Sequence, residues 1–268
     1  MRPAVVVVAC LLFGLLGGCA STRSFTYEGP DHVRTGACEQ RSPEVFAISG
    51  EIDAELAQCV RDNFADTTRE LALDTEGGSV EAALDIVEVI QGHDLTMRVE
   101  GECNSSCANY FLPLAERIVV EPNAMILLHG SVDPWTIHRW RERKAEFMAM
   151  QTGRGRTVEE AETSFQQLLT DAEALIVRQA AFADRHGVRP GWLLYRVPGS
   201  RQVVGLSDQP TRAVAILVEE RMMRSCLPGV EIAPYQKTLE RRWTRSLRRI
   251  GLFWVRIAPS GRAACTAD

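Results

Sequence analysis

A strand, a turn and a helix follow one another in residues 70–90, ELALDTEGGSVEAALDIVEVI. Residues 70–74 have the β-rich composition of a strand, and the pair Gly77-Gly78 predicts a turn after it. From Val80 to Ile90 the apolar residues recur at helical spacing along one face. A strand that passes through a turn into a helix is the building unit of an α/β layer fold.

The same alternation extends to both sides of this unit. Further strands are predicted at 45–49, 95–99, 117–120, 124–128 and 202–207, and helices at 54–64, 105–115, 134–150, 158–185 and 211–223. The sequence therefore predicts an α/β fold with much parallel pairing.

The N-terminal end has the composition of a bacterial export signal. Arg2 supplies a positive charge, residues 4–16 are almost continuously apolar, and the run ends in Leu16-Gly17-Gly18-Cys19. The apolar run is shorter than the roughly 20 residues of a transmembrane helix. Its end resembles the lipobox of bacterial lipoproteins, which implies cleavage before Cys19 and a lipid, palmitate included, on that cysteine. An ordinary secretory signal is the alternative, and with either signal the mature protein leaves the cytoplasm. The expected location is the bacterial cell envelope, with the chain lipid-anchored and facing the periplasm.

Six cysteines remain after the signal segment and Cys19 are set aside: Cys38, Cys59, Cys103, Cys107, Cys226 and Cys265. An even number in an oxidising compartment indicates disulfides, and free buried thiols are the alternative. The sequence does not choose a pairing. Cys103 and Cys107 could bridge each other or pair with Cys38 and Cys59. No Cys-x-x-Cys or His-x-x-x-His spacing predicts a zinc site, and neither a metal nor a cofactor is expected.

The charge is distributed unevenly along a chain whose net charge is −5. From Arg224 onward the sequence contains nine arginines and lysines and three acids, which gives this segment a net charge of +6 by subtraction. Apolar residues at helical spacing predict an amphipathic helix there (Leu239, Trp243, Leu247 and Ile250). Such a helix could lie on an anionic membrane or pack on the domain with its basic face in water. Nucleic acid is not an expected partner outside the cytoplasm.

Four segments are predicted along the chain. They are a lipoprotein signal peptide at 1–18, a polar tether at 19–42, an α/β domain at 43–223 and a basic C-terminal extension at 224–268.

Four short motifs follow one another within the domain: Gly77-Gly78, Cys103-Asn104-Ser105-Ser106-Cys107, Pro122-Asn123 and His129-Gly130. In this order, over about residues 45–223, they resemble the Clp protease proteolytic subunit and its crotonase-like relatives. The resemblance implies a spiral of ββα units, here with a helical C-terminal extension. The family forms rings and trimers, so the resemblance also allows an oligomer.

The resemblance implies a role for each motif. Ser105 at a helix start would be the nucleophile, and His129 after a later strand would be the base. The N–H groups of Gly78 and Ser106 would form an oxyanion hole. Ser106 is the competing nucleophile if the register differs by one residue. Taken singly, these residues also fit a helix cap, a structural histidine and a plain turn.

The third member of a catalytic triad is not found at the family's position, which aligns with Gln202-Val203. Asp208 lies nearby in the sequence and is the candidate acid, with Asp133 and Asp171 as further options. Two lysines occur in the chain, Lys144 and Lys237, and neither lies in a recognisable serine–lysine dyad motif.

The resulting expectation is an envelope serine hydrolase, a peptidase rather than an esterase, that acts on a peptide or protein substrate. Acyl-CoA chemistry is disfavoured because export separates the chain from coenzyme A. The alternative is a catalytically inactive lipoprotein that uses the same fold as a binding or scaffold module.

Overall fold

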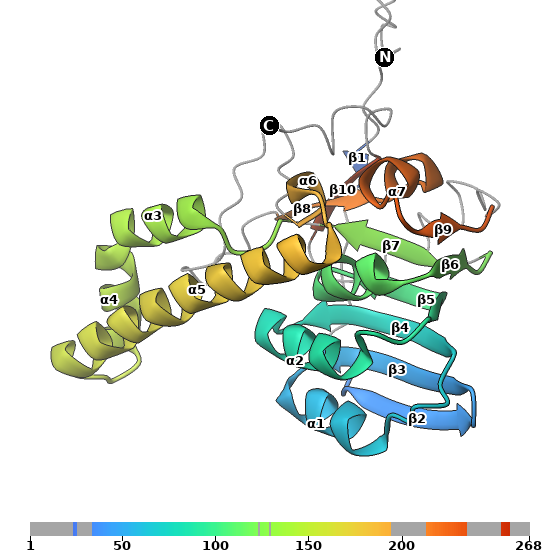
Figure 1. Ribbon diagram of the computed structural model, residues 1–268. Coiled ribbons are helices and arrows are strands. Elements are labelled where there is room, and N and C mark those ends of the chain that lie inside the picture. Colours follow the sequence, from blue (N-terminus) through green and yellow to red (C-terminus); the bar gives the residue numbers. More distant parts are fainter. Residues whose placement is uncertain are drawn as a thin grey trace, which may run out of the picture.

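The computed structural model describes residues 24–25, 34–122, 124–128, 130–193, 213–234 and 253–257. Within these residues the strands form one ten-stranded sheet (Figure 1). The strands are β1 (Ser24–Phe25), β2 (Ala37–Ser42), β3 (Val45–Ile52), β4 (Glu70–Gly78), β5 (Thr96–Asn104), β6 (Arg117–Val120), β7 (Met125–Leu128), β8 (Ala213–Leu217), β9 (Glu231–Ile232) and β10 (Phe253–Ile257). Their order is β1-β10-β8-β7-β5-β4-β3-β2, and β6 pairs with β5 and β9.

The centre of the sheet is parallel. β3, β4 and β5 pair in parallel, and β5 continues in parallel to both β6 and β7. Antiparallel pairs occur between β2 and β3, between β7 and β8, and between β1 and β10. The predicted α/β class with much parallel pairing is confirmed. One consequence is that β4, β5 and β7 all end at the same edge of the sheet.

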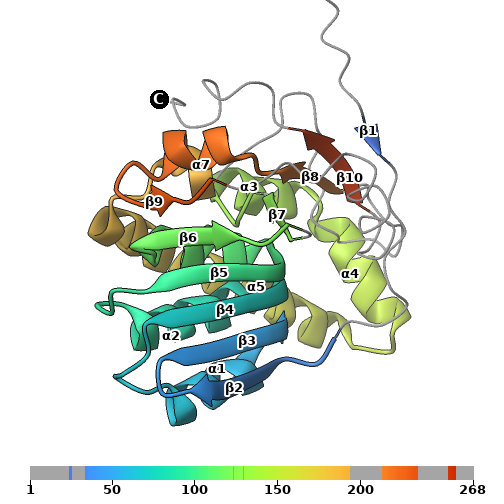
Figure 2. The same ribbon diagram turned by 90° about the vertical axis from the view of Figure 1, so that its right-hand side faces the viewer.

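The helices α1 (Ala54–Asn63) and α2 (Val80–Ile90) lie side by side on one face of this centre (Figure 1). The other described helices are the π-helix η1 (Cys107–Phe111), the 3-10 helix η2 (Leu112–Leu114), α3 (Pro134–Glu142), α4 (Lys144–Gly153), α5 (Val158–His186), α6 (Pro190–Leu193) and α7 (Glu220–Cys226). Figure 2 shows the central strands from the opposite face, with α1 and α2 behind them.

The core lies between the parallel strands and these helices. Leu71 and Leu73 of β4 and Ile86 and Ile90 of α2 are almost completely buried there. Burial of each such side chain stabilises the fold by about 1.5–3 kcal/mol. α2 begins directly after the glycine pair because the hydroxyl of Ser79 accepts a hydrogen bond from the amide of Ala82. The predicted strand–turn–helix unit is confirmed.

A second, smaller core holds α3, α4 and α5 together. It contains Trp140, Phe147 and Phe165, and the rings of Phe147 and Phe165 lie 5.3 Å apart. In Figure 1 these helices extend beyond the sheet as an arm, with α3 and α4 beside the outer half of α5.

Three predicted helices differ from the structure. Residues 213–217 of the predicted helix 211–223 are strand β8, and α7 begins only at Glu220. The run AVAIL is apolar throughout and therefore has no periodicity that separates a buried strand from a helix. The predicted helix 105–115 begins with a turn at Ser105 and continues as η1 and η2, and the predicted helix 134–150 is interrupted at Arg143.

The predicted tether and C-terminal extension also contain strands. Residues 37–42 form β2, an edge strand whose exposed polar side chains lack hydrophobic alternation. In the extension, which the sequence predicts as helical, Glu231–Ile232 and Phe253–Ile257 are strands β9 and β10. The signal segment, the lipid-bearing Cys19, the last predicted strand at 202–207 and the amphipathic residues 239–250 lie outside the described residues. Among the helices that are described, none is long and apolar enough to cross a membrane.

Candidate active site

Ser105 occupies the turn that directly follows β5. It is half-buried, and its φ of +54° is the one positive value of a non-glycine residue within the described part of the chain. This left-handed conformation costs roughly 1–2 kcal/mol. Two hydrogen bonds hold it: the Ser105 amide donates to the Leu127 carbonyl at 2.8 Å, and the Ser105 carbonyl accepts from the Asn109 amide at 2.9 Å. Backbone strain that the surrounding structure maintains in this way is typical of functional sites.

The glycine pair at the end of β4 lies against this turn. A Cβ atom on Gly77 would lie 2.6 Å from the Cβ of Ser105 and 2.4 Å from the carbonyl oxygen of Asn104. Gly77 also has a φ of +88°. Because a side chain at position 77 would clash with the turn of Ser105, Gly77 allows this close packing in addition to turning the chain.

Alanine at Gly77 is expected to lower the free energy of unfolding by about 2–5 kcal/mol, since backbone strain and overpacking act together. Gly92 is the matched control: its φ is +84°, and a Cβ there would meet nothing within 4 Å. Gly92→Ala should therefore cost only the strain, about 1 kcal/mol. Urea unfolding of both variants measures the difference, and equal losses would contradict the close approach of Gly77 to Ser105.

Ser106 lies beside Gly78. Its side chain is buried, with 2% exposure, and its hydroxyl donates to the carbonyl oxygen of Gly78 at 3.2 Å. The hydroxyl of Ser106 is thus engaged inside the fold, whereas Ser105 is more accessible. Of the two neighbouring serines, Ser105 is the better candidate nucleophile. This hydrogen bond places the Ser106 side chain against the main chain of Gly78, the other residue predicted for the oxyanion hole.

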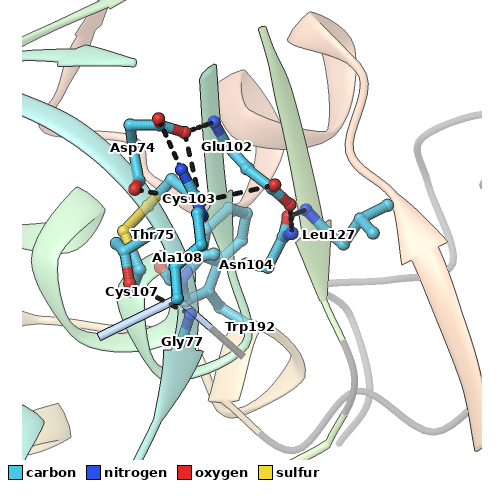
Figure 3. Close-up of a disulfide and its surroundings, with 11 residues drawn as sticks. Asp74, Thr75, Gly77, Glu102, Cys103, Asn104, Cys107, Ala108, Leu127 and Trp192 are labelled. Carbon is cyan, nitrogen blue, oxygen red and sulfur yellow. Dashed lines mark hydrogen bonds and ion pairs between the residues drawn. A yellow bond between two sulfur atoms is a disulfide. The ribbon is translucent and has the colours of Figure 1, made fainter. Parts of the chain in front are cut away.

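A disulfide closes the turn around Ser105. Cys103 and Cys107 are bridged, with Cα atoms 5.2 Å apart, and both are fully buried (Figure 3). A second disulfide joins Cys38 of β2 to Cys59 of α1, and Cys226 is also disulfide-bonded. The structure therefore selects the mutual pairing of Cys103 with Cys107, and neither offers a free thiol as a nucleophile.

Hydrogen bonds from other parts of the fold hold the helix η1, which follows Ser105. The indole of the fully buried Trp192 donates to the carbonyl of Ala108 at 3.0 Å (Figure 3). The Tyr110 hydroxyl donates to Gln179 of α5 at 2.6 Å and lies 2.8 Å from the Ser131 hydroxyl. Burial raises the pKa of Tyr110, so it stays a neutral phenol. These contacts connect the turn of Ser105 with the segment that follows β7.

Carboxylates that the sequence analysis did not single out lie next to the same turn. Glu102 accepts from the side-chain amide nitrogen of Asn104 at 2.6 Å and faces Arg34 at 3.4 Å. Arg34 also forms ion pairs of 2.7 Å with Asp74 and with Glu76. Burial raises the pKa of Glu102 to about 7, the charge of Arg34 opposes the rise, and Glu76 and Asp74 add to it. Alternating acids on β4 and β5 were the sequence signal for this cluster.

The partners predicted for Ser105 are described in part. His129 and the candidate acid Asp208 lie outside the described residues. Asp133 caps α3, because it accepts from the amide and the hydroxyl of Thr136 at 2.7 and 2.9 Å. Asp171 is exposed on α5 and accepts from Gln167 at 2.7 Å.

Of the two lysines, the structure describes Lys144. The Lys144 ammonium group is paired with Glu162 at 2.6 Å, on the arm formed by α3, α4 and α5. Lys237 lies outside the described residues. Over the part of the chain that is described, His, Cys, Asp and Glu residues form no group that could hold a metal ion.

A hollow of about 240 Å³ opens between α2, α3 and α5. One side begins at Glu81, three residues beyond Gly78, and another at Val132, four residues beyond the end of β7. Its walls are mostly apolar and are formed by Val132, Trp140, Leu168, Ala172, Ala174 and Leu175, with Glu81, Asp171 and Arg178 as charged members. A space of this composition suits an apolar side chain.

No protein-family model matches the sequence, and no curated protein matches it. Among solved structures, the chain is similar to a ClpP1 mutant from Listeria monocytogenes, with 19% sequence identity and a TM-score of 0.29. The match covers 45% of this chain and 78% of that chain. Similarity at this level does not indicate a function for this chain.

Proposed function

We propose that this protein is a serine hydrolase of the bacterial envelope, a peptidase in which Ser105 is the nucleophile and His129 the base. The observation that carries the proposal is the turn at Ser105. A half-buried serine in a left-handed conformation is enclosed by a disulfide and lies against Gly77, where a Cβ atom would clash with it. Maintaining such a conformation costs free energy that a helix cap would not require.

The order of the strands supports the choice of base. Ser105 directly follows β5, and position 129 directly follows β7. The two strands are parallel neighbours, with Asn104 in register with Leu127, so both end at the same edge of the sheet. An imidazole at that edge would take the proton of the Ser105 hydroxyl as Oγ attacks a carbonyl carbon, and later deliver it to the leaving amine.

The main chain beside Ser105 supports stabilisation of the resulting oxyanion. Attack places a negative charge on the carbonyl oxygen, which needs N–H donors already in position. The amides of Gly78 and Ser106 are the donors that we propose, and Asp208 is the acid that we propose for orienting His129. The apolar hollow between α2, α3 and α5 favours a peptide, whose side chain it could accept, over a simple ester.

The envelope location and the finer fold assignment are part of the same proposal. Cys103–Cys107 and Cys38–Cys59 are bridges of a kind that persists in oxidising compartments. With the lipobox-like end, this supports export, lipidation at Cys19 and attachment to a membrane facing the periplasm. The parallel strand–helix core is compatible with a Clp/crotonase-like spiral of ββα units.

A serine-directed fluorophosphonate tests the proposal. The full chain, with its disulfides intact, should react with one equivalent of the probe, and mass spectrometry should locate the adduct on Ser105. A folded chain that stays unmodified would instead support the inactive binding or scaffold module.

Loss of the Cys103–Cys107 bridge is expected to slow this labelling by about tenfold, because the turn of Ser105 becomes less constrained. The double variant Cys103→Ser/Cys107→Ser tests this, with Cys38→Ser/Cys59→Ser as the matched control. The control bridge spans 21 residues against four, so its loss should destabilise the fold more, about 3 against about 2 kcal/mol. The prediction would be contradicted if the less stable Cys38→Ser/Cys59→Ser variant labelled more slowly than Cys103→Ser/Cys107→Ser.

A further inference from the structure

The side chain of Asn104 connects the two strands whose ends precede Ser105 and position 129. Asn104 is the last residue of β5 and is 4% exposed. Its side-chain oxygen accepts from the amide of Leu127 in β7 at 3.1 Å, and its side-chain nitrogen donates to Glu102 at 2.6 Å (Figure 3). A buried carboxamide with both ends bonded has one fixed orientation.

The consecutive residues Asn104 and Ser105 bind both the amide and the carbonyl of Leu127. Its amide donates to the side chain of Asn104, and its carbonyl accepts from the amide of Ser105 at 2.8 Å. One residue, Leu128, then separates it from position 129. The distance between the end of β7 and the Ser105 turn therefore depends on the carboxamide of Asn104 together with the main-chain hydrogen bond of Ser105.

We propose that Asn104 is a positioning residue, which sets the distance between Ser105 and the end of β7, the strand that His129 follows in the sequence, and that Glu102 fixes the orientation of the Asn104 carboxamide. This inference rests on the proposed function. Asn104 touches neither substrate nor the reacting atoms and acts through the position of β7. Misplacement of a reacting group by about 1 Å can cost 10²-fold in rate, so a hydrogen bond at this place has a large kinetic effect.

The surroundings of Glu102 explain why it can hold the carboxamide. Arg34 faces it from the N-terminal segment, and Asp74 and Glu76 face it from β4. The amide of Glu102 donates to Asp74 at 3.0 Å, which fixes the main chain of β5 next to Asn104. Above a pH of about 7 Glu102 is ionised and can only accept hydrogen bonds, so the NH₂ group of Asn104 turns toward it and the oxygen toward Leu127.

Exchange of the two groups provides the test. Asn104→Asp places two carboxylates side by side, so the acceptor for Leu127 is displaced, and fluorophosphonate labelling at pH 8 should slow by about tenfold. Glu102→Gln/Asn104→Asp restores both hydrogen bonds with the net charge unchanged, because the carboxylate introduced at position 104 would accept from Leu127 and from the side-chain amide introduced at position 102. This double variant should return to within about threefold of the wild-type rate, and Glu102→Gln alone should lose no more than about threefold.

The outcomes separate this inference from the proposed function. A wild-type chain that does not react removes the proposed function, and the inference with it. Two outcomes with a reactive wild type overturn the inference alone. In one, folded Asn104→Asp labels at the wild-type rate; in the other, the double variant labels as slowly as Asn104→Asp. Urea unfolding of each variant distinguishes positioning from stability. Should Asn104→Asp fold poorly, Asn104→Ala, which lacks the acceptor, replaces it, and a wild-type labelling rate there is equally contradictory.

Discussion

Alanine at position 105 is expected to lower fluorophosphonate labelling at least about 10³-fold, because the probe forms its bond with the oxygen that the variant lacks. Ser105 is the more accessible of the two serines in its turn, and its positive φ departs from the extended backbone of β5. The rate of adduct formation, followed by intact mass, measures the effect.

Ser106→Ala is the matched control for this variant. Its hydroxyl donates to the carbonyl of Gly78, but its main-chain amide, the proposed oxyanion donor, is kept in the variant. Labelling should therefore remain within about tenfold of the wild-type rate. Labelling that vanishes in Ser106→Ala and persists in Ser105→Ala would assign the nucleophile to the neighbouring residue.

His129→Ala is expected to slow the labelling of Ser105 by about 10²–10⁴-fold, the usual contribution of a general base. In the wild type the rate should rise with pH as the imidazole loses its proton. The variant should lose this dependence. Labelling rates between pH 5 and pH 9 measure both effects.

His138 provides the control for His129. It lies on α3 with a side chain that is 66% exposed and near Glu142. His138→Ala should label at the wild-type rate with the wild-type pH profile. A folded His129→Ala that keeps the rate and the profile would remove His129 from the mechanism.

The sequence predicted the centre of the fold because local signals and packing agree there. Residues 70–90 carry a buried strand, a glycine turn and an amphipathic helix, and all three are present as β4, the Gly77-Gly78 end and α2. The structure adds the reason for the glycine at 77, which is its contact with Ser105, a residue distant in sequence.

The secondary structure predicted from the sequence is wrong where pairing with distant strands determines the local structure. β8 lies between β7 and β10 in the sheet, and its sequence is apolar throughout, so the sequence alone is equally consistent with a buried helix. β2 is a polar edge strand within the predicted tether. The hydrogen bond from Leu127 to Asn104 joins strands that meet only after folding, so no spacing in the sequence reveals it. The pairing of Ser105 with His129 and Asp208 stays a prediction, since both partners lie outside the described residues.

The most direct test of the account is a crystal structure of the fluorophosphonate-treated chain. We expect a covalent bond from the Ser105 oxygen to phosphorus, the phosphonyl oxygen facing the amides of Gly78 and Ser106, and the His129 imidazole within about 2.6–3.2 Å of the Ser105 oxygen. An adduct on another residue, or an imidazole remote from Ser105, would contradict the account.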